Sequence, residues 1–259
     1  MFRNAVLFAI AALLVREGAP RAAGDRPTPI LLELFTSEGC SSCPPADSLL
    51  QHLIDASPRS GLQIIGLGHH VDYWDHQGWR DRFSSSALTA RQQVYGDVLH
   101  VDAIYTPQMI ADGRFQFVGS DAAAGRRALE QAAALPHGAL DVAVQSAGVN
   151  HATVVVTASR LPAVARRDRA DVVIAVTEDG LQSNVRAGEN RGRTLSHAAV
   201  VRRLSTIGEA TGEQASARAD IVLDKDWQRD RLKVVAFVQE HSSRRVLAAG
   251  FVSLPGLSR

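Results

Sequence analysis

The chain has 259 residues, of which 46% are hydrophobic and 21% charged, and its formal net charge is +1. This hydrophobic content is ordinary for globular proteins and argues against intrinsic disorder. The balanced charge argues against a surface dedicated to nucleic acid or anionic lipid, so we expect no nucleic-acid partner. Two cysteines are too few for a disulfide-dense scaffold or a four-cysteine metal centre, and we predict no cofactor.

The N-terminus is typical of a secretory signal. Arg3 precedes the apolar run Ala5–Val15, which is shorter than the roughly 20 residues that a membrane-spanning helix needs. Ala22-Ala23-Gly24 offers small residues for cleavage. We therefore predict a signal peptide at residues 1–24, with an uncleaved amphipathic helix as the alternative. The mature chain is expected to be exported, periplasmic or secreted, and without an integral membrane segment.

Residues 25–135 alternate between strand-like and helix-like segments. Apolar runs predict buried strands, and apolar residues at helical spacing after an initial proline predict a helix. The expected elements are strand Ile30–Phe35, helix Pro44–Ala56, strand Leu62–Leu67, a helix near Ser86–Val98, strands Gln108–Ala111 and Phe115–Val118, and a helix from a Ser120-Asp121 cap to about Leu135. The order β-α-β-α-β-β-α predicts a mixed sheet covered by helices.

The pattern changes after Pro136-His137-Gly138. Residues 136–259 contain little helical periodicity and several alternating runs, which predict an antiparallel β-sandwich-like domain. The expected strands are Leu140–Gln145, Thr153–Ala158, Val172–Thr177, Ala219–Leu223, Lys233–Gln239 and Leu247–Val252.

Both cysteines lie in one C-x-x-C motif, Cys40-Ser41-Ser42-Cys43, between a predicted strand and a predicted helix. A helix N-terminus favours a thiolate because its backbone N–H groups are unpaired and its dipole end is positive. We expect Cys40 to be the exposed attacking thiol and Cys43, one turn into the helix, to be the resolving thiol. A structural disulfide and half of a metal site remain as alternatives.

A Thr-Pro step precedes the third predicted strand. Proline is tolerated at the first position of a strand. A cis bond between Thr106 and Pro107 would let the Thr106 backbone approach the sulfurs and pair with an extended substrate.

These features together resemble the thioredoxin superfamily. More narrowly, ELFTSEGCSSCPPAD (33–47), HVDYWD (70–75), GWRDRFSS (78–85), YTPQMIADG (105–113) and GENRGRTLSH (188–197) resemble domain-of-unknown-function family 1223, whose members are exported thioredoxin-like proteins with a β-rich C-terminal half. The resemblance implies a thioredoxin-like fold for residues 25–135, with Cys40 and Cys43 at the redox motif and Pro107 at the cis-proline position. The resemblance does not identify a substrate.

The sequence departs from ordinary thioredoxins in the acidic residues that could transfer protons at the cysteines. Leu34 stands where a thioredoxin has its buried acid, and Glu33 is expected to face the other side of the strand. Glu38 is interpreted either as an aid to proton transfer at the cysteines or as a solvated turn residue.

A polar loop follows the second predicted strand, where the carboxyl ends of strands form the functional edge of such sheets. His69, His70, Asp72, Trp74 and His76 lie in it. One hypothesis has its histidines join the cysteines around a soft metal such as Cu(I). The other gives His70, Asp72 and Trp74 a structural, substrate-shaping or proton-transfer role.

A second polar run, residues 188–197, lies between predicted strands of the C-terminal half. Its two glycines and its asparagine predict unusual backbone angles. Glu189, Arg193 and His197 are expected to form an ion-paired network or to face the redox motif across the domain interface.

The sequence thus predicts an exported thiol–disulfide oxidoreductase acting through Cys40, Cys43, Thr106 and Pro107. Its partners would be a thiol- or disulfide-bearing protein or small molecule and an electron-exchange partner. The alternatives are a copper-binding or copper-delivery module and a secreted interaction protein with a structural disulfide.

Overall fold

The computed structural model describes residues 27–57, 60–147 and 150–254. The predicted signal peptide, residues 1–24, lies outside the described residues. Among the described residues, no helix combines the length and apolarity needed to cross a membrane.

The N-terminal elements follow the expected order β-α-β-α-β-β-α. They are β1 (Thr28–Thr36), α1 (Pro44–Ala56), β2 (Leu62–His70), α2 (Ser86–Val98), β3 (Gln108–Ala111), β4 (Phe115–Val118) and α3 (Ala122–Ala133). Side-chain caps set two helix starts: Ser85 accepts a hydrogen bond from the Ala87 N–H, and Asp121 accepts from those of Ala123 and Ala124. The hairpin between β3 and β4 turns through Asp112 and Gly113, both at positive φ.

The C-terminal half is built from strands, with one short 3-10 helix (Arg229–Arg231) in its described part. The strands are β5 (Ala139–Ala147), β6 (His151–Ser159), β7 (Ala170–Glu178), β8 (Leu181–Asn184), β9 (Thr194–His197), β10 (Val200–Glu209), β11 (Ala215–Val222), β12 (Leu232–Glu240) and β13 (Val246–Ser253). The six predicted strands are present. The sequence missed β8, β9 and β10, whose mixture of polar and apolar residues lacks an apolar run.

One sheet of eight strands runs through both halves of the chain, in the order β13-β12-β7-β10-β2-β1-β3-β4. β1 pairs in parallel with β2 and antiparallel with β3, and β10 joins β2 in parallel through Val200 and Gly68. Three further strands form an antiparallel sheet, β11-β6-β5, and β8 pairs with β9 in a separate hairpin. The boundary predicted at residue 136 stays a prediction, and the large sheet takes strands from both sides of it.

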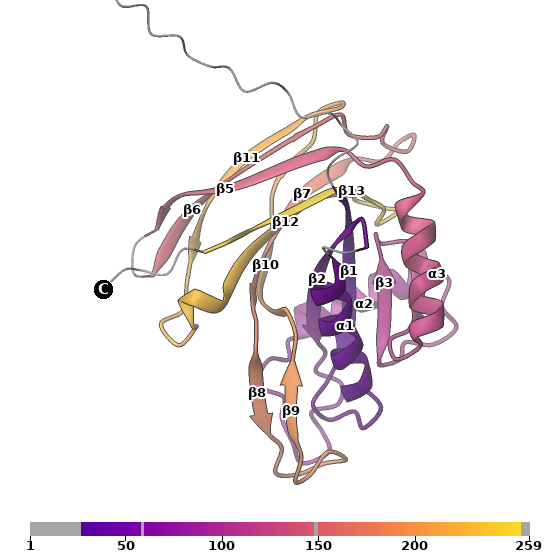
Figure 1. The fold of residues 1–259 in the computed structure, drawn as a ribbon, viewed down its shortest axis with the longest axis vertical. Helices are drawn as coiled ribbons and strands as arrows, with labels where there is room; N and C mark the ends of the chain where they lie inside the picture. Colours follow the sequence, from indigo (N-terminus) through magenta and orange to yellow (C-terminus); the bar gives the residue numbers. More distant parts are fainter. Residues whose placement is uncertain (1–26, 58–59, 148–149, 255–259) are drawn as a thin grey trace, which may run out of the picture.

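The two faces of the large sheet are covered differently (Figure 1). Ile30, Leu32 and Leu34 of β1 pack with α1 and α3, while Leu31 lies in a core on the opposite face with Leu88 of α2. β7 alternates in the same way. Its Val172, Ile174 and Val176 pack with the three-stranded sheet, while Val173 and Ala175 pack on the α2 face. The fold is therefore a mixed sheet with helices, joined to an antiparallel sheet that covers part of one face.

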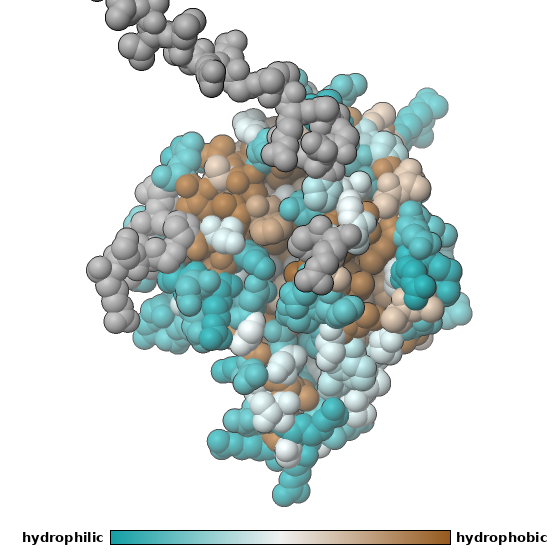
Figure 2. Space-filling view, in the orientation of Figure 1, coloured by the Kyte–Doolittle hydropathy of each residue, from teal (hydrophilic) through white to brown (hydrophobic). Residues whose placement is uncertain are grey.

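The β8–β9 hairpin projects from the sheets and lies alongside α1 (Figure 1). In the same orientation, polar residues predominate around this end, and apolar residues gather over the sheets and between the helices (Figure 2). The hairpin therefore brings polar residues from the C-terminal half to the start of α1.

Candidate functional site

Cys40 and Cys43 form a disulfide at the junction of β1 and α1. α1 begins at Pro44, so Cys43 is its N-cap residue, whereas the sequence placed it one turn inside the helix. The reason is that Pro44 and Pro45 open the helix. They also lack N–H groups, and the next two N–H groups, of Ala46 and Asp47, both donate to the Cys43 carbonyl.

Both cysteines are buried, with 0% of Cys40 and 1% of Cys43 exposed. The expectation of an exposed Cys40 is therefore wrong for this structure. The loop between β8 and β9 covers the cysteine segment, and its Asn190 is itself fully buried. The Asn190 Nδ2 donates to the carbonyl oxygens of Glu38 and Cys40, each at 2.9 Å.

The loop is held in this position by further contacts. The Arg193 guanidinium donates to Asn190 Oδ1 at 2.7 Å, and the exposed Glu189 carboxylate accepts from the Ser41 N–H at 3.0 Å. Gly188 and Gly192 have positive φ, as predicted for the glycines of this run, whereas Asn190 does not. Both hydrogens and the oxygen of the Asn190 amide are thereby used, which fixes the loop over the disulfide.

The Thr106-Pro107 bond is cis. Thr106 is connected to the cysteine segment through Trp74, whose indole Nε1 donates to Thr106 Oγ1 at 2.8 Å. Trp74 also packs against Gly39, because a Cβ atom on Gly39 would lie 3.0 Å from the Trp74 Cβ. Trp74 thus joins the cis peptide, through its indole, to the residue before Cys40, through its Cβ.

His69 and His70, which the sequence placed in the polar loop, are the last two residues of β2, and they and the loop residues are bonded to one another and to neighbouring elements. His70 Nδ1 donates to Asp81 Oδ2 at 2.6 Å, and Asp72 Oδ1 accepts from Thr89 Oγ1 at 2.6 Å. His69 Nε2 contacts Glu33 on β1 at 2.8 Å, and His76 is exposed. These contacts fit the structural hypothesis for Asp72 and Trp74. Among the described residues, the group around His70 whose atoms lie close enough to bind a metal consists of Asp47, His70 and His197. Neither cysteine belongs to it.

Glu38 is fully buried, so the solvated-turn interpretation is wrong. Its Oε2 accepts from the Trp79 indole at 2.7 Å, and its Oε1 lies 3.3 Å from His197 Nε2. On the other side of the imidazole, His197 Nδ1 lies 3.3 Å from Asp47 Oδ1. Burial alone would lower the pKa of His197, but Asp47 and then Glu38 outweigh burial and raise it to about 9.

A second buried acid, Glu33, faces away from the Leu34 side, as expected. Burial would raise the pKa of Glu33, but the Arg91 guanidinium and a hydrogen bond with His69 hold it well below its usual range. Arg91 Nε donates at 2.6 Å, and the Tyr95 hydroxyl donates to the same carboxylate. Arg91 also reaches Gln239 of β12 at 3.0 Å, so the pair ties α2 and β1 to the C-terminal half.

The structure brings Glu189, Arg193 and His197 to the cysteine segment, but each has its own partner and they form no ion-paired network with one another. Sequence reasoning missed Asn190, Asp47 and Asp81. All three lie within motifs quoted for the resemblance, and that membership was the available signal. Nothing local marks Asn190 as a clamp on residues 150 positions away.

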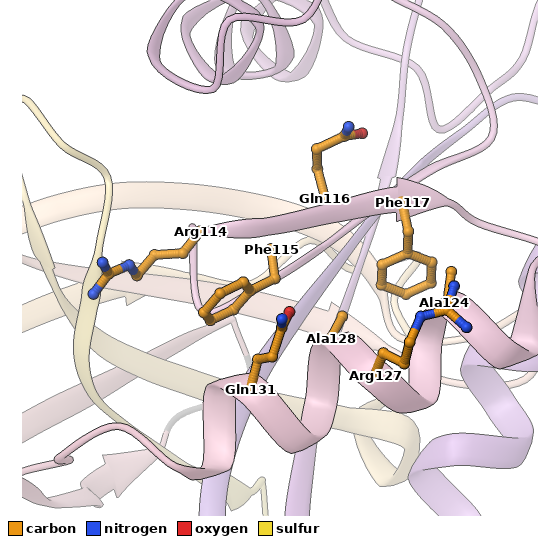
Figure 3. A pocket seen from close by; sticks show the side chains of 8 residues that line it. All are labelled: Arg114, Phe115, Gln116, Phe117, Ala124, Arg127, Ala128 and Gln131. Atoms are coloured by element: carbon orange, nitrogen blue, oxygen red, sulfur yellow. The ribbon is translucent and has the colours of Figure 1, made fainter.

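A shallow cavity of about 370 Å³ lies elsewhere, between β4 and α3. Phe115 and Phe117 point towards α3, and Gln116 points to the opposite side of the strand (Figure 3). Its remaining lining residues are Arg114, Ala124, Arg127, Ala128 and Gln131. None of the predicted site residues lines it, so the candidate site remains the covered disulfide.

The family model for a protein of unknown function (DUF1223) matches residues 31–239. The chain belongs to this family. The match includes β1, the disulfide, the β8–β9 hairpin and the strands that complete the large sheet up to β12. No curated protein matches this DUF1223 chain significantly.

Two solved structures are similar over most of this DUF1223 protein. Protein AGR_C_4864 from Agrobacterium tumefaciens is 26% identical, with a TM-score of 0.66 over 89% of this chain and 96% of its own. HBP35 of Porphyromonas gingivalis is 14% identical, with a TM-score of 0.65 over 91% of this chain and 79% of its own. The second likeness shows the fold alone. Since they cover 89% and 91% of this chain, both alignments extend over residues on each side of position 136.

Proposed function

We propose that this DUF1223 protein is an exported thiol–disulfide oxidoreductase whose N-terminal part has a thioredoxin-like fold. The observation that carries the proposal is the Cys40–Cys43 disulfide at the start of α1, with Trp74 in contact with both Gly39 and Thr106 of the Thr106-Pro107 step. A C-x-x-C pair between a strand and a helix is the arrangement that exchanges electrons in thiol–disulfide proteins.

The strand order supports the thioredoxin-like assignment. β2-β1-β3-β4 forms a mixed sheet with α1 and α3 on one face and α2 on the other. The proposal of export rests on the charged, apolar and small-residue segments at residues 1–24.

The proposed exchange has two steps. A thiolate of a dithiol substrate attacks Cys40 Sγ, so that a mixed disulfide forms, the Cys40–Cys43 bond breaks, and Cys43 leaves as a thiolate that takes up a proton. The second substrate thiolate then attacks the substrate sulfur of the mixed disulfide and releases Cys40. Two electrons pass from the substrate to the protein, and the reverse sequence reduces a substrate disulfide.

Because both sulfurs are buried, the exchange requires the protein to open before a substrate can react. A substrate reaches Cys40 after the loop around Asn190 has moved, because that loop covers the cysteine segment. Thr106 is then positioned to pair with the substrate backbone, and Trp74 fixes Thr106 against Gly39.

Single cysteine variants test the proposal. In Cys43→Ser, reduced and then incubated with oxidised glutathione, a stable mixed disulfide is expected at Cys40 because the resolving thiol is absent. In Cys40→Ser, exchange with a dithiol peptide is expected to fall to the uncatalysed rate. Mass spectrometry and a thiol-exchange assay give the two readouts.

The exposed Ser216→Ala variant, on β11 away from the cysteines, is the control, and its exchange rate is expected to match the wild type. If Cys43→Ser forms no adduct and the wild type catalyses no exchange, the cysteines form an inert bridge and the proposal fails.

A further inference from the structure

A second group of chemically active residues lies behind the disulfide, in what we call the His70–His197 cluster: Glu38, Asp47, His70, Asp81 and His197. All five residues are at most 5% exposed. They come from the β1–α1 loop, α1, β2, the loop after β2, and β9. The redox exchange proposed above uses none of these side chains.

His70 presents an unpaired nitrogen to this cluster. The Asp81 carboxylate acts as an acceptor throughout, taking hydrogen bonds from the N–H groups of Glu38 and Phe83 as well as from His70 Nδ1. Since Nδ1 carries the donated proton, the neutral imidazole has its lone pair on Nε2. That Nε2 is buried without a hydrogen-bond partner.

His197 faces His70 across the cluster, with the two ring centroids 4.7 Å apart. One ligand atom from each of Asp47, His70 and His197 lies within 4.8 Å of the others. Glu38 Oε1 is 3.3 Å from His197 Nε2, and neither atom has a hydrogen-bond partner. Three potential ligand atoms, one oxygen and two nitrogens, therefore lie close together in the buried group Asp47, His70 and His197.

The cluster is also short of positive charge. Three carboxylates, of Glu38, Asp47 and Asp81, are buried there, and their ion pairs among the described residues are with His70 and His197, not with Arg or Lys. Even with His197 as a cation, the carboxylates outnumber the positive charges of the cluster. The buried carboxylate of Glu33 differs from these three, because it forms an ion pair with Arg91. Buried carboxylates need a cationic partner, and a divalent cation provides one.

We propose that the His70–His197 cluster binds a divalent transition-metal ion of the zinc class, with Asp47, His70 and His197 as its three protein ligands and a water molecule in the fourth position. Two imidazoles with a carboxylate are a ligand set that suits Zn²⁺. Asp81 holds His70 through its other nitrogen, which is the outer-shell carboxylate arrangement of histidine metal ligands. The site differs from a copper site on the cysteines, because its ligands are oxygen and nitrogen atoms.

Such an ion would join β2, α1 and β9 at one point and thereby fasten the β8–β9 hairpin over the disulfide. Binding does not depend on the redox activity of the cysteines, so the two proposals fail separately.

The test uses the untagged full chain with its disulfide intact, so that the sulfurs cannot act as ligands. The protein is stripped with EDTA, incubated with excess ZnCl₂, gel-filtered and analysed for metal. One zinc per chain is expected. His70→Gln and His197→Gln are each expected to lose bound zinc, and Asp81→Asn to weaken binding about 10–100-fold. The exposed His52→Gln, on α1, is the matched control and should keep one zinc.

Cobalt provides a readout that needs no variant. The wild type loaded with Co²⁺ is expected to show the intense visible bands of four-coordinate cobalt, without a thiolate charge-transfer band. Folded wild type that retains no zinc and shows no such cobalt bands overturns the proposal. Equal zinc retention by a folded His70→Gln/His197→Gln double variant also overturns it.

Discussion

Replacing Arg91 by methionine is expected to lower the free energy of unfolding by about 3–5 kcal/mol at neutral pH, because it leaves the Glu33 carboxylate buried without its cation. Methionine keeps much of the apolar stem, so the loss reports mainly the missing charge. Urea unfolding followed by circular dichroism measures it. The exposed Arg126→Met, on α3, is the matched control and should change stability by less than about 0.5 kcal/mol.

The same variant has a defined pH dependence. In the wild type the pKa of Glu33 lies below its usual value, so pairing stabilises the fold above the unfolded-state pKa and this contribution is lost as the pH falls. Without Arg91, burial pushes the pKa upwards, and the cost of the charged carboxylate is relieved by protonation. The difference between wild type and variant is therefore expected to shrink between pH 7 and about pH 4.

A double variant separates charge from packing. Glu33→Leu combined with Arg91→Met removes both charges and is expected to recover much of the stability lost in Arg91→Met. A loss below about 1 kcal/mol in Arg91→Met, with no change on acidification, would contradict this account of the Glu33–Arg91 pair.

Removing the Asn190 clamp is expected to accelerate reduction of the Cys40–Cys43 disulfide. Asn190→Ala deletes two buried hydrogen bonds to the carbonyls of Glu38 and Cys40, each contributing about 1 kcal/mol. If loop opening precedes attack on Cys40, the rate should rise about 10–100-fold, since about 1.4 kcal/mol corresponds to a factor of ten. Alkylation of new thiols during reaction with a limiting phosphine reductant, read by mass shift, gives the rate.

Two further variants in the hairpin sharpen this prediction. Asn190→Asp preserves the shape but turns a carboxylate towards two carbonyl oxygens, so its disulfide should be reduced at least as fast as that of Asn190→Ala. Asn184, on β8, accepts a hydrogen bond from Thr194 at the exposed end of the hairpin, and Asn184→Ala should behave like the wild type. Equal reduction rates in all four proteins would show that the loop does not control access.

The elements before residue 136 could be read from the sequence because their signals are local. Helix α1 has its prolines and apolar spacing, Asp121 caps α3, and the residues on either side of Leu34 alternate between two buried faces. Periodicity within ten or so residues is sufficient for such features.

The association of the two halves could not be read in this way. β10 joins β2 through Val200 and Gly68, and such a pairing between distant segments leaves no periodic trace in either strand. The buried state of Cys40 has the same origin, because its cover is a loop from the β8–β9 hairpin. Glu38 was misjudged because its burial depends on His197 and Trp79, which local sequence does not place beside it.

The most direct test of the central claim is the reduction potential of the Cys40–Cys43 pair. The protein is equilibrated in glutathione and dithiothreitol buffers, quenched, and scored by thiol-alkylation mass shift. We predict a midpoint between about −180 and −270 mV, the range from protein disulfide isomerase to thioredoxin. A pair that stays oxidised below about −300 mV would be a structural bridge and would contradict the proposed exchange function.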